Sequence, residues 1–135
     1  MKSLRYILLL TVTLLTIGAS AKPLKTQVYM FGFSASFKDS VIYATDIQNI
    51  EGAWIDSKTK FLLGRDLYSI QLKEYLADKL QQPGRICIVF YATKKKKAEK
   101  QFLKLMKKYQ KGYDMRYLNA TEFKFEAIDT SPEQE

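Results

Sequence analysis

The sequence predicts a single α/β (α+β) domain, a two-layer sandwich in which two helices cover one face of a mixed sheet of about four strands. Three observations predict this class. Several segments alternate apolar and polar residues with the period of a strand, two segments carry apolar residues at helical spacing, and turn-forming residues separate them. The order of elements is β-β-α-β-α-β, with an expected strand order of 2-1-3-4 and a right-handed parallel crossover at the end.

The first two strands are expected to form an antiparallel hairpin. Residues 27–37 alternate between a mainly aromatic face and a face of smaller residues, and residues 41–50 alternate in the same way. The three residues Lys38-Asp39-Ser40 between them have the composition of a tight turn, and so short a connection favours a hairpin. Residues 51–65 fit either a second small hairpin or an ordered loop folded over one end of the sheet.

Two helices and two further strands complete the order. Asp66 is the expected N-cap of a helix over residues 67–81. Residues 85–92 are apolar on both faces, which predicts a central strand. A second helix follows that strand, and the last strand, over residues 114–128, is expected to be bent or broken near Asn119. The inward faces of the helices are formed by Tyr68, Leu72, Tyr75, Leu76 and Leu80 in the first, and by Ala98, Phe102, Leu105, Met106 and Tyr109 in the second.

The first 21 residues are typical of a secretory signal peptide. Lys2 and Arg5 give a positive start, residues 7–17 are apolar, and residues 19–21 (Ala-Ser-Ala) fit an A-x-A cleavage site. The apolar run is shorter than the roughly 18 residues that argue for a spanning helix, which makes an uncleaved anchor the weaker alternative. We therefore expect cleavage after Ala21, a periplasmic or secreted protein, and no stable membrane anchor after cleavage.

Residues 22–128 are expected to form one domain, followed by a flexible acidic tail over residues 129–135. Cys87 is the only cysteine, so no disulfide within the chain stabilises the domain and its hydrophobic core must do so. Cys87 lies in an apolar run. We expect it to be a small buried core residue rather than a reactive thiol.

The composition excludes several classes of catalytic site. The chain has no histidine, which rules out Ser-His-Asp and Cys-His catalysis and every histidine metal site. One cysteine excludes a thiolate zinc site, and no phosphate-binding glycine loop is present. We expect no metal, no cofactor and no enzymatic activity. The alternative is a small hydrolase that uses two of the carboxylates in the middle third of the chain, which are Asp46, Glu51, Asp56 and Asp66.

The most distinctive segment is the lysine-rich second helix, residues 94–111. One interpretation is the solvated face of an amphipathic helix. However, the lysines at its start lie where the helix dipole is positive, so they gain nothing there for the isolated helix. Together with the backbone N–H groups of that end, they predict an anion-binding site. Its candidate residues are Lys94, Lys95, Lys96, Lys97 and Lys100. Because the run lacks arginines and exposed aromatics, we expect no nucleic-acid binding.

One face of the expected sheet suggests a protein partner. If both helices cover the opposite face, a mildly apolar surface stays uncovered, and we expect it to pair with another envelope protein or with a second copy of the chain. That surface contains Met30, Ser34, Ser36, Ile42 and Ala44.

Residues 119–121 (Asn-Ala-Thr) match an N-glycosylation signal, which we interpret as a chance match in a strand.

Several short segments resemble small exported proteins of the Bacteroidota. They are Val28 to Ser40, Thr45 to Gln48, Ala53 to Leu62, Arg65-Asp66, Ala98 to Lys100 and Tyr117-Leu118, which together span most of the domain. The resemblance implies a Gram-negative envelope setting and carries no established activity. In that setting Asp39-Ser40-Val41 resembles a short O-glycan acceptor, with Ser40 as the modified residue.

Three hypotheses follow. The leading one is an exported, non-enzymatic interaction module of the envelope or the secreted fraction. The alternative is a binder of polyanions or anionic glycans through the lysine-rich helix, and the third is a small hydrolase.

Overall fold

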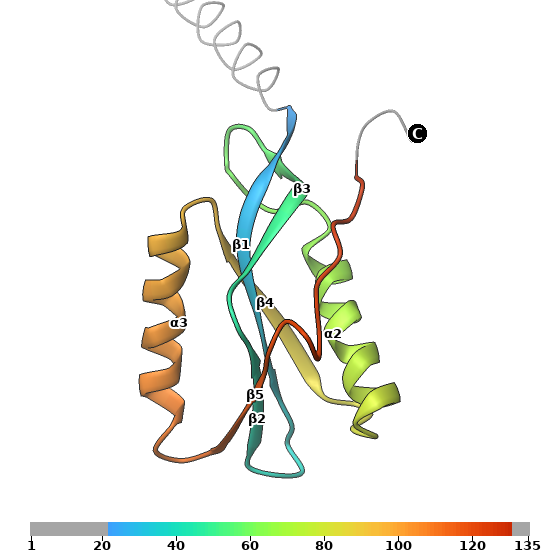
Figure 1. Cartoon of the computed structure of the whole chain (residues 1–135), viewed down its shortest axis with the longest axis vertical. Coiled ribbons are helices and arrows are strands. Elements are labelled where there is room, and N and C mark those ends of the chain that lie inside the picture. The colour runs from blue at the N-terminus through green and yellow to red at the C-terminus, as the bar shows by residue number, and fades with distance from the viewer. Residues whose placement is uncertain (1–21, 131–135) are drawn as a thin grey trace, which may run out of the picture.

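The computed structural model of the chain describes residues 22–130. The expected signal peptide (1–21) and residues 131–135 of the expected tail lie outside the described residues. The described part is an α+β sandwich (Figure 1) of five strands and two helices, which confirms the predicted fold class and adds one strand. The elements are β1 (Pro23–Ala35), β2 (Val41–Thr45), β3 (Gln48–Asp56), α2 (Arg65–Lys79), β4 (Ile86–Ala92), α3 (Lys95–Tyr109) and β5 (Asp114–Leu118).

The long strand β1 is the centre of the sheet. Its Met30 pairs with Gln48 of β3 and with Tyr91 of β4, so these two strands lie on opposite edges of β1. Further along, β2 takes the place of β3, and β5 pairs with β2 in parallel. The β1–β2 hairpin is antiparallel, as predicted. Figure 1 shows the strands as one twisted layer between the helices.

The second expected strand is divided into β2 and β3. At the division the backbone leaves the ladder, and the side chain of Thr45 replaces the missing backbone partner. Its hydroxyl accepts a hydrogen bond from the Gly32 N–H (2.8 Å) and donates one to the carbonyl of Asp46 (2.9 Å). Because the Gly32 N–H is buried, it needs such a partner.

The two helices lie on opposite faces of the sheet, so the prediction of a two-layer sandwich with both helices on one face is wrong. Helix α2 buries Tyr68, Leu72 and Leu76 against the face of β1 that carries Val28 and Met30. Helix α3 packs on the other face, where Phe102 meets the ring of Phe31 edge-on with centroids 5.2 Å apart. Figure 1 shows one helix on each side. The reason is that β1 is apolar on both faces, and both must be covered.

This arrangement covers the sheet surface expected to bind a partner. Met30, Ser34, Ile42 and Ala44 are each at most 1% exposed, and Ser36, just after β1, is half-buried. Met30 and Ser34 lie under α2, and Ile42 and Ala44 lie under α3. A partner or a second copy would therefore have to bind elsewhere on the molecule.

Strand β4 is an edge strand and not the expected central one. Among the described strands it pairs with β1 alone, while β5 lies beside β2 instead of beside β4. The expected strand order is wrong at this point. The apolar residues of β4 are needed because α2 and α3 cover its two faces. On the α3 side of β4, Ile86 and Ile88 near its start remain 44% and 46% exposed.

Residues 51–65 form the small hairpin that was one of the two expected arrangements. Strand β3 continues to Asp56, whose carboxylate accepts hydrogen bonds from the N–H groups of Lys58 (2.8 Å) and Thr59 (2.9 Å) in the turn. Ile55 then pairs with Leu62. The N-cap of α2 is Gly64, with a left-handed φ of 71°, and Asp66 lies in the first turn, so the predicted N-cap is wrong.

The chain after β5 is not a continued strand. Asn119 starts a turn, in which its side-chain oxygen accepts hydrogen bonds from the N–H groups of Thr121 and Glu122. Residues 123–128, here called the strap, then cross the face that α2 covers and bury Phe123 and Phe125 there. The break near Asn119 is therefore confirmed, and the strand beyond it is absent from the described chain. Within residues 22–130 neither helix is long and apolar enough to cross a membrane.

Candidate functional site

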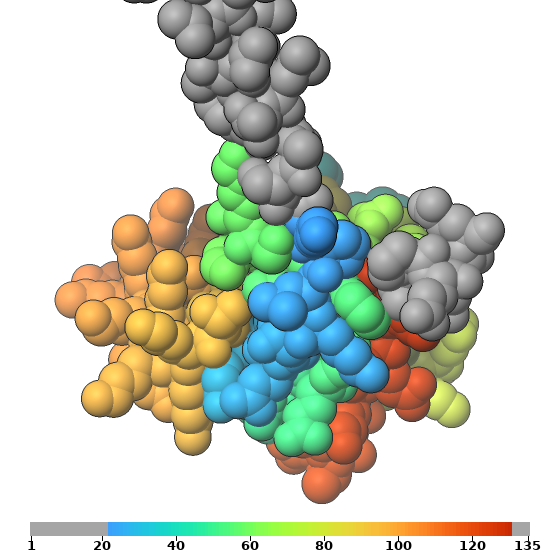
Figure 2. Space-filling model, turned by 90° about the horizontal axis from the view of Figure 1, so that it is seen from above, coloured from blue at the N-terminus to red at the C-terminus, as the bar shows by residue number. Residues whose placement is uncertain are grey.

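A cavity of about 340 Å³ lies where β4 ends and α3 begins. Its walls come from three places in the chain: the loop between β3 and α2 with the first residue of that helix, the end of β4, and the first two turns of α3. The lining residues are Thr59, Lys60, Phe61, Arg65, Phe90, Tyr91, Ala92, Thr93, Lys97 and Gln101. Figure 2 looks onto this end of the molecule and shows the green loop next to the gold and orange residues of α3.

A second hollow, of about 430 Å³, lies beside this cavity on the surface of α3. It is lined by Lys94, Lys96, Lys97 and Lys100. Lys97 therefore borders both hollows. Four of the five lysines predicted as an anion site converge here, while Lys95 lines neither hollow.

The two hollows together form a continuous cationic region, which we call the basic surface. It consists of Lys60, Arg65, Lys94, Lys96, Lys97 and Lys100. Among the described residues that line the two hollows there is no carboxylate. Such a cluster of like charges produces a strong positive potential at one end of the molecule.

Helix α3 begins without a side-chain cap. Lys94 is its N-cap residue and has extended backbone angles (φ −118°, ψ 133°), but no side chain accepts from the first-turn N–H groups. The first turn also lacks an acidic residue. Lysine at this position forgoes the roughly 0.5–2 kcal/mol that Ser, Thr, Asp or Asn would contribute there. The carbonyl of Lys94 accepts from the N–H groups of Lys97 and Ala98 (both 3.2 Å), and no side chain caps this end of the helix.

Arg65 and Tyr91 fix the wall of the cavity. Arg65 donates from Nε to the carbonyl of Val89 (2.9 Å), and its guanidinium lies 5.5 Å from the centre of the Tyr91 ring. The hydroxyl of Tyr91 accepts a hydrogen bond from the N–H of Leu62 (3.0 Å), which ties the loop to β4. The loop position of Lys60, where φ is 65°, follows from the turn that Asp56 holds.

One polar atom near the cavity lacks a partner. Gln101 lines the cavity from α3, and its Oε1 is buried without a hydrogen-bond partner in the described part of the chain. Leaving a buried acceptor unsatisfied costs roughly 1–3 kcal/mol. Sequence reasoning missed Gln101, Lys60, Phe61 and Arg65 as site residues, because only the fold brings the loop to the start of α3.

Ser40, the candidate O-glycan acceptor, is exposed in the turn between β1 and β2. Its carbonyl accepts a hydrogen bond from the N–H of Asp114 (2.8 Å). The turn lies at the end of the molecule opposite the start of α3 (Figure 1). Glycosylation of Ser40 remains a prediction.

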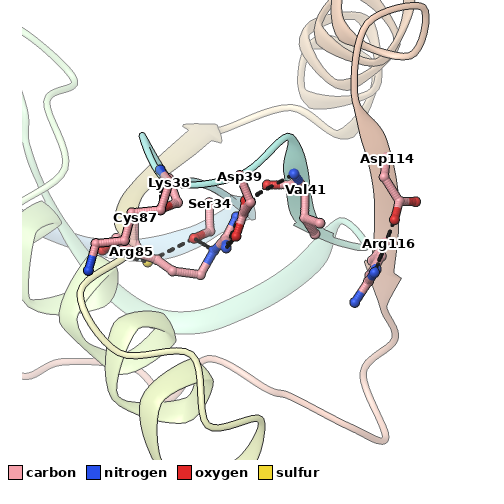
Figure 3. Close-up of polar contacts among 9 residues, drawn as sticks. Ser34, Lys38, Asp39, Val41, Arg85, Cys87, Asp114 and Arg116 are labelled. Carbon is pink, nitrogen blue, oxygen red and sulfur yellow. Dashed lines mark hydrogen bonds and ion pairs between the residues drawn. The ribbon is translucent and has the colours of Figure 1, made fainter.

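Beside Ser40, Asp39 is part of a polar network around Arg85 (Figure 3). The N–H of Val41 and the guanidinium of Arg85 lower the pKa of the Asp39 carboxyl, with the Val41 N–H as the larger cause. Arg85 itself is only 2% exposed and also donates from Nε to Ser34 Oγ (3.2 Å).

Cys87 lies half-buried next to this network, with its Sγ 3.5 Å from Ser34 Oγ. Burial raises the pKa of the thiol. A raised pKa lowers the thiolate fraction at neutral pH, which disfavours a reactive cysteine. This agrees with the prediction of a packing role, although the side chain is less buried than expected.

The four carboxylates of the hydrolase hypothesis are not brought together. Asp56 holds the hairpin turn, and Asp46 accepts hydrogen bonds from Gln48 Nε2 (3.4 Å) and from the N–H of Ala120 (3.2 Å). Glu51 instead shares a hollow of about 450 Å³ with Glu126, and both side chains are exposed. No group of three or more histidine, cysteine or acidic residues within residues 22–130 is placed to hold a metal ion.

We compared the chain with models of protein families, with curated proteins and with solved structures, and none of the three comparisons found a match.

Proposed function

We propose that the protein is an exported, non-enzymatic interaction module that binds an anionic ligand, in particular a polyanionic glycan, at the basic surface. The observation that carries this proposal is the convergence of six cations from three separate parts of the chain on two adjoining hollows. A solvated helix face accounts for lysines along α3. It does not account for Lys60 and Arg65, which reach the same place from the loop and from α2.

The electrostatics favour an anion at this place. The cations repel one another, and the dipole of α3 adds positive potential at the same end. The chain also leaves the first turn of α3 uncapped. Arg65 and Lys60 have partners in the carbonyls of Val89 and Ser57, whereas the lysine repulsion along α3 and its uncapped first turn destabilise the free protein, and a bound anion offsets both. Local features that destabilise the free protein are typical of functional sites.

The shape of the basic surface favours an extended ligand. Because Lys97 borders both hollows, a chain with several negative charges can contact both at once. A nucleic acid is disfavoured, since only one of the six cations is an arginine and the hollow on α3 is lined by lysines alone. Acidic polysaccharides fit the envelope setting that the resemblance to exported proteins of the Bacteroidota implies.

The proposal is tested by retention on immobilised heparin, with two quadruple variants that remove the same charge. In one, Lys94, Lys96, Lys97 and Lys100 become glutamine. In the matched control, glutamine replaces Lys104, Lys107, Lys108 and Lys111, which line neither hollow. For the first variant we expect elution at lower salt than for the control, and a slope of log K against log [NaCl] smaller by about one per contacting lysine. Equal elution of the two variants, both folded, contradicts the proposal.

A second candidate function is self-association through the open edge of β4. Among the strands of residues 22–130 it pairs with β1 alone, and Ile86 and Ile88 are nearly half exposed on the α3 face near its start. Antiparallel pairing of two such edges near Ile86 and Ile88 would extend the ladder and reduce the exposure of both side chains. Farther along β4 the Val89 carbonyl already accepts from Arg65 Nε (2.9 Å). Light scattering distinguishes the cases: Ile88→Lys should convert a dimer to a monomer, and a wild-type protein that is monomeric at high concentration excludes this candidate.

A further inference from the structure

The cavity contains more than cations. Phe61 is 66% exposed at its rim, and Phe90 and Tyr91 line it from β4. Thr59 and Thr93 also line it, and the Thr59 hydroxyl accepts a hydrogen bond from the N–H of Phe61 (3.2 Å). A surface that attracts anions by charge alone needs neither the aromatic rings nor the hydroxyls, whereas ligand sites with defined orientation combine apolar walls with a few polar groups.

We infer that the cavity binds one anionic sugar unit, such as a uronate at the end of or within a polyanionic glycan. This inference rests on the proposed function and names the unit that the site recognises. The carboxylate of the sugar contacts Arg65 and Lys97, and one face of the sugar ring lies against Phe61. Lys60 lines the same wall, and its Nζ donates to the carbonyl of Ser57 (2.8 Å). Aliphatic C–H groups of a sugar ring carry a small positive charge and favour the negative face of an aromatic ring.

The volume of the cavity agrees with a single ring. At about 340 Å³ it lies at the lower end of the range of small-molecule sites, which is roughly 300–1,000 Å³. The remainder of a longer glycan would continue over the neighbouring hollow, where Lys94, Lys96 and Lys100 supply charge without aromatic residues. The cavity thus recognises the sugar ring, and the neighbouring hollow on α3 binds the rest of the glycan.

Gln101 supplies the hydrogen-bonding acceptor that a hydroxyl-rich ligand requires. Its unsatisfied Oε1 is buried in the wall. In the proposed complex, rotation about the side-chain torsions turns the carboxamide toward the ligand. There a sugar hydroxyl donates to the oxygen, which an acetate ion cannot do because it has no donor. A buried acceptor left without a partner is unfavourable in the free protein, so a ligand that satisfies it gains affinity.

The test is a binding titration with three small probes, glucuronate, glucose and acetate, followed by NMR. We expect glucuronate to bind at least several times more tightly than either of the others, because only glucuronate combines the charge with the ring. Phe61→Ala should weaken glucuronate binding roughly five- to tenfold. The matched control is Phe37→Ala, since Phe37 is 95% exposed in the turn between β1 and β2.

Gln101→Leu provides a second variant that separates binding from folding. If Oε1 serves the ligand, this change lowers affinity for glucuronate while the melting temperature stays equal or rises. If Gln101 only supports the fold, Gln101→Leu will lower the melting temperature and leave the affinity for glucuronate unchanged.

The inference is overturned if glucuronate binds no better than acetate, or if Phe61→Ala behaves like Phe37→Ala. These results leave the heparin experiment untouched. Conversely, equal heparin elution of the two lysine variants would contradict the proposed function even if glucuronate were bound.

Discussion

The guanidinium of Arg85 at the start of β4 lies 3.1 Å from the carboxylate of Asp39, in the turn between β1 and β2 (Figure 3). Arg85 is almost fully buried, also donates to the carbonyl of Val41, and lies 4.9 Å from the centre of the Tyr43 ring. The contact joins the edge strand to the opposite side of β1. Because a buried cation needs partners, this network fixes the hairpin turn relative to β4.

This ion pair predicts how stability depends on pH. The N–H of Val41, and secondly Arg85, lower the pKa of Asp39 in the folded state below its unfolded value of about 3.9. A lowered folded-state pKa contributes stability above the unfolded pKa, and this contribution is lost as the pH falls through the folded value. We expect Asp39→Asn to be less stable than the wild type at pH 6, and the difference to shrink below pH 4.

Urea unfolding at pH 6 and at pH 3 measures this difference. Asp56 also has a lowered pKa, caused mainly by the N–H groups of Thr59 and Lys58, so both proteins will show some acid dependence. The informative quantity is therefore the difference in free energy of unfolding between the wild type and Asp39→Asn. A difference that stays constant from pH 6 to pH 3 contradicts the role assigned to the Asp39 charge.

Gly32 is expected to tolerate no side chain. A Cβ there would lie 2.6 Å from Leu72 Cδ2 and 3.1 Å from Phe125 Cζ, in a part of the core where both side chains are buried. Gly32→Ala should destabilise the protein by about 1–3 kcal/mol through overpacking. Gly112→Ala is the matched control, because nothing lies within 4 Å of its added Cβ. In thermal unfolding we expect a lower melting temperature for Gly32→Ala than for Gly112→Ala. Equal melting temperatures would show that α2 shifts to make room for the added Cβ.

Because α3 begins without a side-chain cap, replacing Lys94 by an acidic residue is expected to stabilise the folded protein. Lys94→Asp places an acceptor at the N-cap and a negative charge at the positive end of the dipole, which should stabilise the fold by about 0.5–2 kcal/mol. The same change should weaken retention on heparin. Lys104→Asp, in the middle of the helix, alters the charge equally without capping and should not stabilise. A destabilised Lys94→Asp variant would mean that Lys94 has a structural role in the turn.

The strap depends on two glutamine side chains. Gln48 donates to the carbonyl of Phe123 (2.9 Å) and accepts from the N–H of Phe125 (2.8 Å), as a neighbouring strand would. Gln71 makes the same pair of bonds to Glu126 (2.9 and 3.0 Å). Gln48→Leu leaves both buried backbone groups without partners, at roughly 1–3 kcal/mol for each.

Hydrogen exchange of the Phe125 amide measures the effect, and we expect much faster exchange in Gln48→Leu. Gln110→Leu, at an exposed position after α3, serves as the control. If the Phe125 amide is equally protected in both variants, the strap is held by its phenylalanines alone.

The sequence predicts the elements of this fold better than their arrangement. Both helices, the hairpin and the aromatic strand follow from local periodicity, which is a property of neighbouring residues. The placement of α2 and α3 on opposite faces does not follow from periodicity. Val28 and Met30 are apolar at alternate positions whether α2 or a partner covers them. The edge position of β4 was missed for a related reason: a strand covered by helices on both faces is apolar wherever it lies in the sheet.

The candidate site was predictable only in part. The lysines at the start of α3 are consecutive, so their clustering is visible in the sequence, and four of the five candidates converge. Lys60, Arg65 and Gln101 carry no local signal, since a turn lysine, a first-turn arginine and a helical glutamine are ordinary in their own contexts. Only the hairpin after β3 brings the first two to the cavity.

The most direct test of the basic surface is a titration of the isotope-labelled protein with a short heparin-derived oligosaccharide, followed by amide chemical shifts. We expect saturable shifts that are largest in residues 59–65 and 93–101, from the loop, α2 and the start of α3. Shifts spread evenly along the lysines of residues 104–111, or largest on β5, would contradict it.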